Sequence, residues 1–118
     1  MTVRRLKTYA GSQGYVYQYS FVEKRTAGPA EAEAVEYIFE VTSDRKQIFP
    51  VSVVLPRQVI LAWAESHLRP LADSEQYAAV KLRLFRAFDE LEDMLSEGRQ
   101  LHIDSGFLEE SLAALGVE

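Results

Sequence analysis

The spacing of hydrophobic residues changes near the middle of the chain. In the first half, hydrophobic and aromatic residues fall on alternate positions over residues 15–21, 35–41 and 49–55, which is the period of a β-strand. A further candidate strand, residues 3–9, is separated from the first of these runs by residues 11–14. This segment contains Gly11 and Gly14 and suits a hairpin turn. These patterns predict four antiparallel strands joined as a meander.

Residues 73–97 carry the clearest helical pattern of the second half. Asp73 and Gln76 stand where a capping box begins a helix, and Gly98 stands where helices commonly end. One helix of this length would measure about 37 Å. Its apolar residues recur at steps of three and four: Tyr77, Val80, Leu84, Phe88, Leu91 and Leu95.

Shorter elements complete the prediction. Pro56 favours the start of a helix that runs to about His67 or Leu68, residues 100–103 alternate as a short strand, and Asp104 can cap a last helix. Residues 27–34 are expected to form a loop or one helical turn. The expected fold is a single α+β domain over residues 1–118. It has an antiparallel sheet of four or five strands, packed on one face by the long helix and two shorter helices.

The two periods also predict which side chains meet in the core. Helical and strand spacing place seven residues on facing surfaces. They are Phe39, Val53, Trp63, Leu84, Phe85, Phe88 and Leu91.

Composition narrows the classes of protein to be considered. The 118 residues are 47% hydrophobic and 26% charged, as in soluble globular domains, and no apolar run approaches the length of a membrane span. The absence of cysteine excludes disulfides and thiolate catalysis and fits a reducing cytoplasm. The chain has the general look of a small bacterial protein. Its net charge of −5, without a dense basic stripe, argues against nucleic-acid binding.

The tyrosines of the first half are candidates for a binding surface. Tyr15, Tyr17 and Tyr19 share one face of the predicted sheet, and aromatic side chains on a sheet stack ligands or bases in some RNA-binding domains. Such platforms carry basic residues around the rings, and only Lys24 and Arg25 follow on this strand. The favoured interpretation is therefore that this face rests on the helices, with the tyrosine hydroxyls reaching water at the edges.

The opposite face of the sheet carries more aliphatic residues than a solvated face usually does. Alternation assigns Val16, Ile38, Ile48 and Val54 to that face. Burial of such a patch by a second copy of the chain predicts a homodimer, with Ile38 and Ile48 as interface candidates. Isolated apolar residues on a surface are also normal.

An acidic patch is predicted at the end of the long helix. Asp89, Asp93 and Glu97 follow one another at four-residue steps and would lie along one helix face. Such carboxylates can receive a cationic partner, although the helix dipole opposes acidic groups at a C-terminus. A plain solvated face is the favoured interpretation, and a partner surface is the alternative.

No motif assigns a catalytic residue, a metal site or a cofactor. His67 and His102 are the only histidines, and the glycines of residues 11–14 lack the lysine and helix of a phosphate-binding loop. We therefore expect a non-enzymatic module that binds a protein or a ligand. One alternative is a small enzyme with Glu or Tyr acid–base groups in a cleft between sheet and helix. Another is an acidic inhibitor or immunity-type protein that covers a basic site on its target.

Overall fold

The computed structural model describes residues 5–118. It is an α+β fold, as predicted, with a one-turn 3₁₀ helix, η1, inside the loop expected at residues 27–34. The elements in chain order are β1 (Lys7–Ala10), β2 (Val16–Ala27), η1 (Ala30–Ala32), β3 (Ala34–Thr42), β4 (Phe49–Pro56), α1 (Arg57–His67), α2 (Asp73–Glu90), α3 (Met94–Glu97), β5 (Gln100–His102) and α4 (Ser105–Ala114).

The sheet follows the predicted meander for its first four strands and then changes direction. Its spatial order is β1-β2-β3-β4-β5, and the first three pairings are antiparallel. The last strand, β5, pairs with β4 in parallel, so the sheet is mixed. A parallel neighbour requires a long crossover, and the segment containing α1, α2 and α3 provides it.

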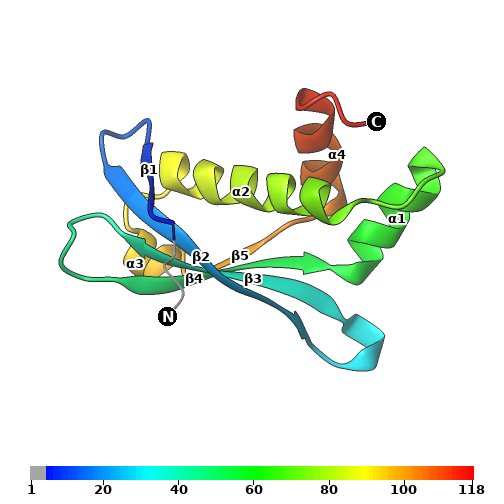
Figure 1. The fold of residues 1–118 in the computed structure, drawn as a ribbon, viewed down its shortest axis with the longest axis horizontal. Helices are drawn as coiled ribbons and strands as arrows, with labels where there is room; N and C mark the ends of the chain where they lie inside the picture. Colours follow the sequence, from blue (N-terminus) through cyan, green and yellow to red (C-terminus); the bar gives the residue numbers. More distant parts are fainter. Residues whose placement is uncertain (1–4) are drawn as a thin grey trace.

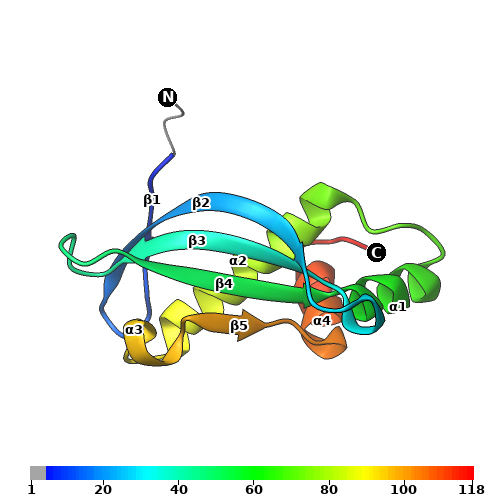
Figure 2. The same cartoon turned by 90° about the horizontal axis from the view of Figure 1, so that it is seen from below.

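One face of the sheet is covered by helices. The helices α2 and α4 lie over this face, and the β1–β2 hairpin bends up around the C-terminal end of α2 (Figure 1). Figure 2 shows the molecule from below, with the uncovered face of the sheet toward the viewer. In this view the strands lie in front of α2 and α4. The strand β3 alternates accordingly, because Tyr37, Phe39 and Val41 are buried against the helices.

The core lies between the sheet and α2, and most of its predicted members are there. Phe85 and Leu91 are only partly buried, because Phe85 stacks on Tyr9 near the edge of the sheet at a ring distance of 4.4 Å and Leu91 follows the end of α2. The predicted core residues that are nearly fully buried are Phe39, Val53, Trp63, Leu84 and Phe88.

The prediction of one helix over residues 73–97 is wrong, because α2 ends at Glu90. The Ser12 hydroxyl donates to the carbonyl of Asp89 at 3.1 Å and the Gln13 amide donates to the carbonyl of Glu90 at 3.0 Å. These bonds satisfy carbonyls that a helix end leaves free. The chain then turns, and the Asp93 carboxylate accepts from the backbone N–H of Ser96 to begin α3. The break moves Asp93 from an unfavourable helix end to a favourable helix start.

The start of α2 also differs from the prediction. The N-cap is Ala72 rather than Asp73, and the Glu75 carboxylate accepts from the Ala72 N–H at 2.9 Å. Glu75 also forms two bonds with the Arg69 guanidinium, at 3.0 and 2.9 Å. Gln76 is buried and donates to the Leu71 carbonyl instead of capping the helix.

The second strand is longer and less regular than predicted. A shift in pairing register between Phe21 and Glu23 marks a β-bulge, and an extra residue at a bulge interrupts strict alternation. The first strand begins at Lys7, and the predicted residues 3–4 lie outside the described part of the chain. Because β1 pairs with β2 only from Val16 to Tyr19, the rest of β2 has no strand on its outer side within residues 5–118.

Candidate functional site

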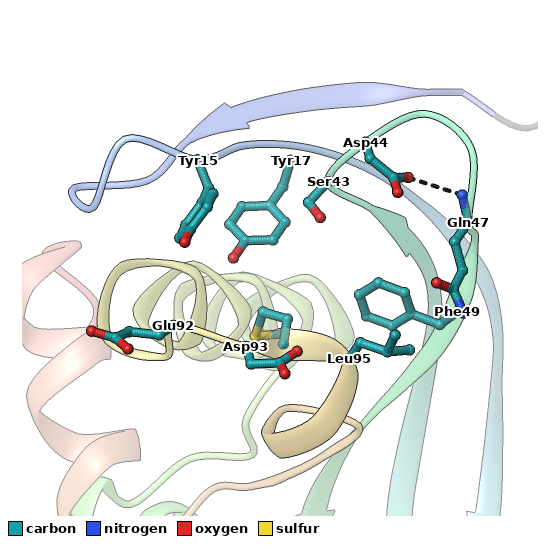
Figure 3. Close-up of a pocket in the computed structure, with 10 residues that line it drawn as sticks. Tyr15, Tyr17, Ser43, Asp44, Gln47, Phe49, Glu92, Asp93 and Leu95 are labelled. Carbon is teal, nitrogen blue, oxygen red and sulfur yellow. Dashed lines mark hydrogen bonds between the residues drawn. The ribbon is translucent and has the colours of Figure 1, made fainter.

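A small pocket opens where the β1–β2 hairpin, the β3–β4 loop and the α2–α3 connection meet (Figure 3). Its volume is about 180 Å³. We call it the acidic pocket because three of its lining residues are carboxylates. It is lined by Tyr15, Tyr17, Ser43, Asp44, Gln47, Phe49, Glu92, Asp93, Met94 and Leu95.

The β3–β4 loop is held in place by hydrogen bonds from its own backbone. One oxygen of the Asp44 carboxylate accepts from the N–H groups of Lys46 and Gln47 at 2.8 and 2.9 Å. The Thr42 hydroxyl accepts from the N–H of Arg45, which has a positive φ of 64°. The backbone bonds to its carboxylate lower the pKa of Asp44 from its ordinary value. Asp44 is therefore a fixed anion at neutral pH.

The opposite wall is formed by the connection between α2 and α3. Asp93 caps α3 with one carboxylate oxygen, at 3.2 Å from the Ser96 nitrogen, and the exposed Glu92 precedes it. Met94 is buried under this wall. Gly98 lies so close that a Cβ at this position would overlap the Met94 side chain. The absence of a side chain at Gly98 thus leaves room for the Met94 side chain beneath α3.

Tyr17 is the buried polar side chain of the pocket. Only 2% of it is exposed, and its ring stacks on Phe88 with centroids 4.2 Å apart. Its hydroxyl points toward the segment that carries Asp93 (Figure 3) and has no hydrogen-bond partner in the described part of the chain. Burial, followed by the charges of Tyr15 and Asp93, raises the pKa of Tyr17. The hydroxyl is therefore a protonated group that a bound ligand can use.

The lining as a whole suits a positively charged group. Tyr15 is 47% exposed and meets Tyr17 edge to face, with ring centroids 6.3 Å apart, and Phe49 provides a third ring. Aromatic faces and carboxylates both attract ammonium and guanidinium groups. No group of three or more His, Cys, Asp or Glu side chains within residues 5–118 is arranged to hold a metal ion. The rings and carboxylates of the lining are thus groups that can attract an organic cation.

The structure brings together three of the residues singled out from the sequence and separates the others. Tyr15, Tyr17 and Asp93 share the acidic pocket. Tyr19 is 4% exposed and packs against Phe39 and Phe85, in agreement with the interpretation that the tyrosine face rests on the helices.

The expected row of Asp89, Asp93 and Glu97 along one helix face does not exist, because α2 ends before Asp93. The Asp89 carboxylate accepts from the Tyr9 hydroxyl at 2.8 Å and from the Ser12 N–H at 2.9 Å. It therefore anchors the β1–β2 hairpin. Glu97 lies in the last turn of α3, outside the acidic pocket.

The two aliphatic interface candidates lie outside the pocket. Ile38 pairs with Glu23 and Ser52 on the uncovered face of the sheet and is partly buried. Ile48 is 63% exposed and belongs to the β3–β4 loop, just before β4. It therefore lies beside the sheet rather than within a strand.

Sequence reasoning missed Asp44, Phe49 and Glu92 as members of a common site. The signal for Asp44 was present, because an Asp two residues after a Thr in a polar turn favours bonds to the following backbone N–H groups. Phe49 and Glu92 carry no local signal. Their proximity depends on where α2 ends and on how the hairpin meets α3.

The remaining ionisable candidates have structural partners away from the pocket. His67 stacks on Trp63 at a ring distance of 4.1 Å and lies 2.5 Å from the Glu109 carboxylate. The His102 carbonyl accepts from Arg83.

No helix in the described range is long and apolar enough to cross a membrane. Comparisons with protein-family models, curated protein sequences and solved structures gave no match.

Proposed function

We propose that this chain is a non-enzymatic binding module whose acidic pocket takes a lysine or arginine side chain of a partner protein. The observation that carries the proposal is the Tyr17 hydroxyl. The ring of Tyr17 is buried, whereas its hydroxyl opens into the pocket beside Asp93 and has no partner among the described residues. Because no group of the described chain occupies this hydroxyl, its oxygen can accept a hydrogen bond from the cationic end of a ligand.

The size of the pocket supports a side chain rather than a cofactor. Its volume of about 180 Å³ is below the roughly 300–1,000 Å³ that is typical of small-molecule sites. The rings of Tyr15 and Tyr17 would contact the apolar stem, and the carboxylates of Glu92 and Asp93 would face the charged end. Recognition of a basic site on a protein would also fit an acidic inhibitor or immunity-type role. The lack of cysteine suits such a role in the cytoplasm.

The behaviour of Asp44 supports binding over acid–base chemistry. Backbone hydrogen bonds lower its pKa, whereas a general acid at neutral pH needs a raised pKa. A carboxylate that stays ionised provides a constant charge for a cation. An enzyme remains the alternative, and it would show turnover that depends on Tyr17 or Glu92.

The test is a titration of the ¹⁵N-labelled protein with Nα-acetyl-lysine methylamide, whose side-chain ammonium group is free. Binding is followed by NMR chemical shifts. The matched uncharged ligand is N-acetyl-norleucine methylamide, which has a similar stem without the ammonium group. We expect the lysine compound to bind in the millimolar range, with shifts around Tyr17 and Asp93, and the norleucine compound to bind about tenfold more weakly or not at all.

Two variants connect this binding to the pocket. Asp93→Asn removes the charge but keeps a good N-cap for α3, and Tyr17→Phe removes only the hydroxyl. Each should weaken lysine binding several-fold. Asp104→Asn is the control, because Asp104 caps α4 in the same way but does not line the acidic pocket. Equal binding of both ligands, or full binding by Asp93→Asn, would contradict the proposal.

A homodimer through the uncovered sheet face is a second part of the proposal. The supporting observation is that α2 and α4 both lie over the other face (Figures 1 and 2). Val16, on the uncovered face, is 49% exposed. Sedimentation equilibrium at micromolar concentration should give a dimer, and Ile38→Glu should give a folded monomer. A wild-type monomer, or an unfolded Ile38→Glu variant, would contradict this part of the proposal.

A further inference from the structure

A second hollow lies along the outer edge of β2, beside the first half of α2. It consists of two adjoining cavities of about 270 and 380 Å³ that share Phe21 and Tyr77. We call it the edge groove. The smaller cavity includes Arg5 and Lys7, and the larger one includes Lys24.

The backbone along this groove is an unpaired strand edge. The pairing of β1 with β2 stops at Tyr19, so β2 from Ser20 to Ala27 has β3 on one side and no strand of residues 5–118 on the other. Glu23, Lys24, Arg25 and Thr26 are all exposed. An exposed edge presents N–H and C=O groups that can pair with another strand.

The inner side of the edge is apolar. Phe21 is 38% exposed although it is aromatic, and its ring meets that of Tyr77 edge to face at 5.4 Å. The larger cavity extends from these rings to Tyr37. A strand lying along β2 would direct every second side chain toward these rings.

Three cations, Arg5, Lys7 and Lys24, line the groove together with one carboxylate, Asp73, in a chain whose net charge is −5. Lys7 and Lys81 lie close to one another, and no carboxylate in the described chain forms an ion pair with either. Burial and the neighbouring Lys7 lower the pKa of Lys81, as expected for two like charges held together. Lys24 pairs with Asp73 at 3.5 Å. Within residues 5–118, neither Lys7 nor Lys81 thus has a carboxylate partner, and an acidic ligand can provide one.

We infer that the edge groove binds an extended acidic segment of a partner protein, which adds as a strand to the free edge of β2. Carboxylates of the segment would pair with Lys7 and Lys81, and an apolar side chain between them would rest on Phe21 and Tyr77. This mode of recognition combines main-chain hydrogen bonds for affinity with side-chain pockets for specificity. It is independent of cation binding at the acidic pocket.

The test uses a random decapeptide display library selected on the chain of 118 residues. Wild type should enrich sequences with alternating acidic and apolar residues. A Lys7→Glu/Lys81→Glu variant should lose these sequences, and a circular dichroism spectrum that matches wild type shows that this variant is folded. Lys46→Glu is the matched control. Its side chain is exposed in the β3–β4 loop, away from the groove, and it should select the same acidic sequences as wild type.

The strongest selected sequence is then synthesised and measured by fluorescence anisotropy. Loss of both lysine charges should weaken the affinity for this peptide about tenfold or more. N-methylation of alternate backbone amides of the peptide should abolish binding, because it blocks strand pairing. Enrichment of no sequence, enrichment without acidic residues, or binding that tolerates N-methylation in both alternate registers would overturn the inference. Binding of an oligo-thymidine probe in preference to the peptide would likewise overturn it.

Discussion

The two ends of α2 carry hollows built from the same kind of side chain but surrounded by opposite charges. At the C-terminal end, Tyr15 and Tyr17 of the β1–β2 hairpin region meet the carboxylates of Glu92 and Asp93. Along the N-terminal half, Phe21 and Tyr77 lie beside Lys7, which neighbours Lys81. The aromatic alternation of β2 is thus common to both hollows. The charge that decides what each can bind comes from other segments of the chain.

The largest effect is expected from removal of the ring that supports the acidic pocket. Phe88 is fully buried and stacks on Tyr17, so Phe88→Ala should lower the free energy of unfolding by about 3–5 kcal/mol. Phe21→Ala, at a ring that is 38% exposed, should cost much less. Urea denaturation measures both. A loss below about 1 kcal/mol for Phe88→Ala would show that the ring does not form part of the core.

A smaller loss is expected from the hairpin anchor. Asp89→Ala removes the acceptor of the Tyr9 hydroxyl and of the Ser12 N–H, and should lower the free energy of unfolding by about 1–2 kcal/mol. Asp93→Asn, four residues further on, should cost little because Asn keeps the cap of α3. Equal losses in thermal melting would contradict the distinction between a structural Asp89 and a ligand-facing Asp93.

The contrast between these two aspartates shows where sequence reasoning succeeds and where it stops. Strand alternation correctly placed Phe39 and Val53 in the core, because burial on one face repeats every two residues. The end of α2 was missed because its carbonyls are satisfied by Ser12 and Gln13, which are distant in sequence. A helical period continued beyond the real helix, and no local pattern reports such long-range caps.

The charge coupling within the acidic pocket has a spectroscopic consequence. Because the Asp93 charge opposes ionisation of Tyr17, Asp93→Asn should lower the pKa of Tyr17, while burial keeps it above 10.0. A titration of ¹³C-labelled tyrosine by NMR measures this shift. Tyr77 is the internal control, since burial alone raises its pKa. An unchanged Tyr17 pKa would show that the two groups do not face a common space.

The smallest effect is expected at the β3–β4 loop. Hydrogen bonds lower the pKa of Asp44 below its ordinary value of 3.8. Its contribution to stability is therefore present above that value and is lost as the pH falls through the lower, folded-state pKa. Asp44→Asn should flatten the acid side of the stability curve, measured by thermal melting. Ser43→Ala should leave that curve unchanged, and an equally steep acid limb in Asp44→Asn would contradict the assignment.

The composition of the sites was less predictable than the fold. Tyr15, Tyr17 and Asp93 could be singled out by residue type, but their assembly required the break after Glu90, which the continued apolar spacing through Leu91 and Leu95 concealed. The edge groove was hidden by the bulge after Phe21. The bulge turns the Lys24 side chain toward the helix side of the sheet. There the Lys24 ammonium lies 5.6 Å from the centre of the Tyr37 ring and pairs with Asp73.

The most direct test compares the two ends of α2 in one measurement. The ¹⁵N-labelled protein is titrated separately with N-acetyl-lysine methylamide and N-acetyl-glutamate methylamide, and shifts of assigned amides are mapped. We predict that the lysine compound moves the signals of Tyr15, Tyr17 and Asp93, and that the glutamate compound moves those of Lys7, Phe21 and Lys81. Lysine-induced shifts in the edge groove, or the same weak shifts for both ligands, would contradict the proposed division of charge between the two sites.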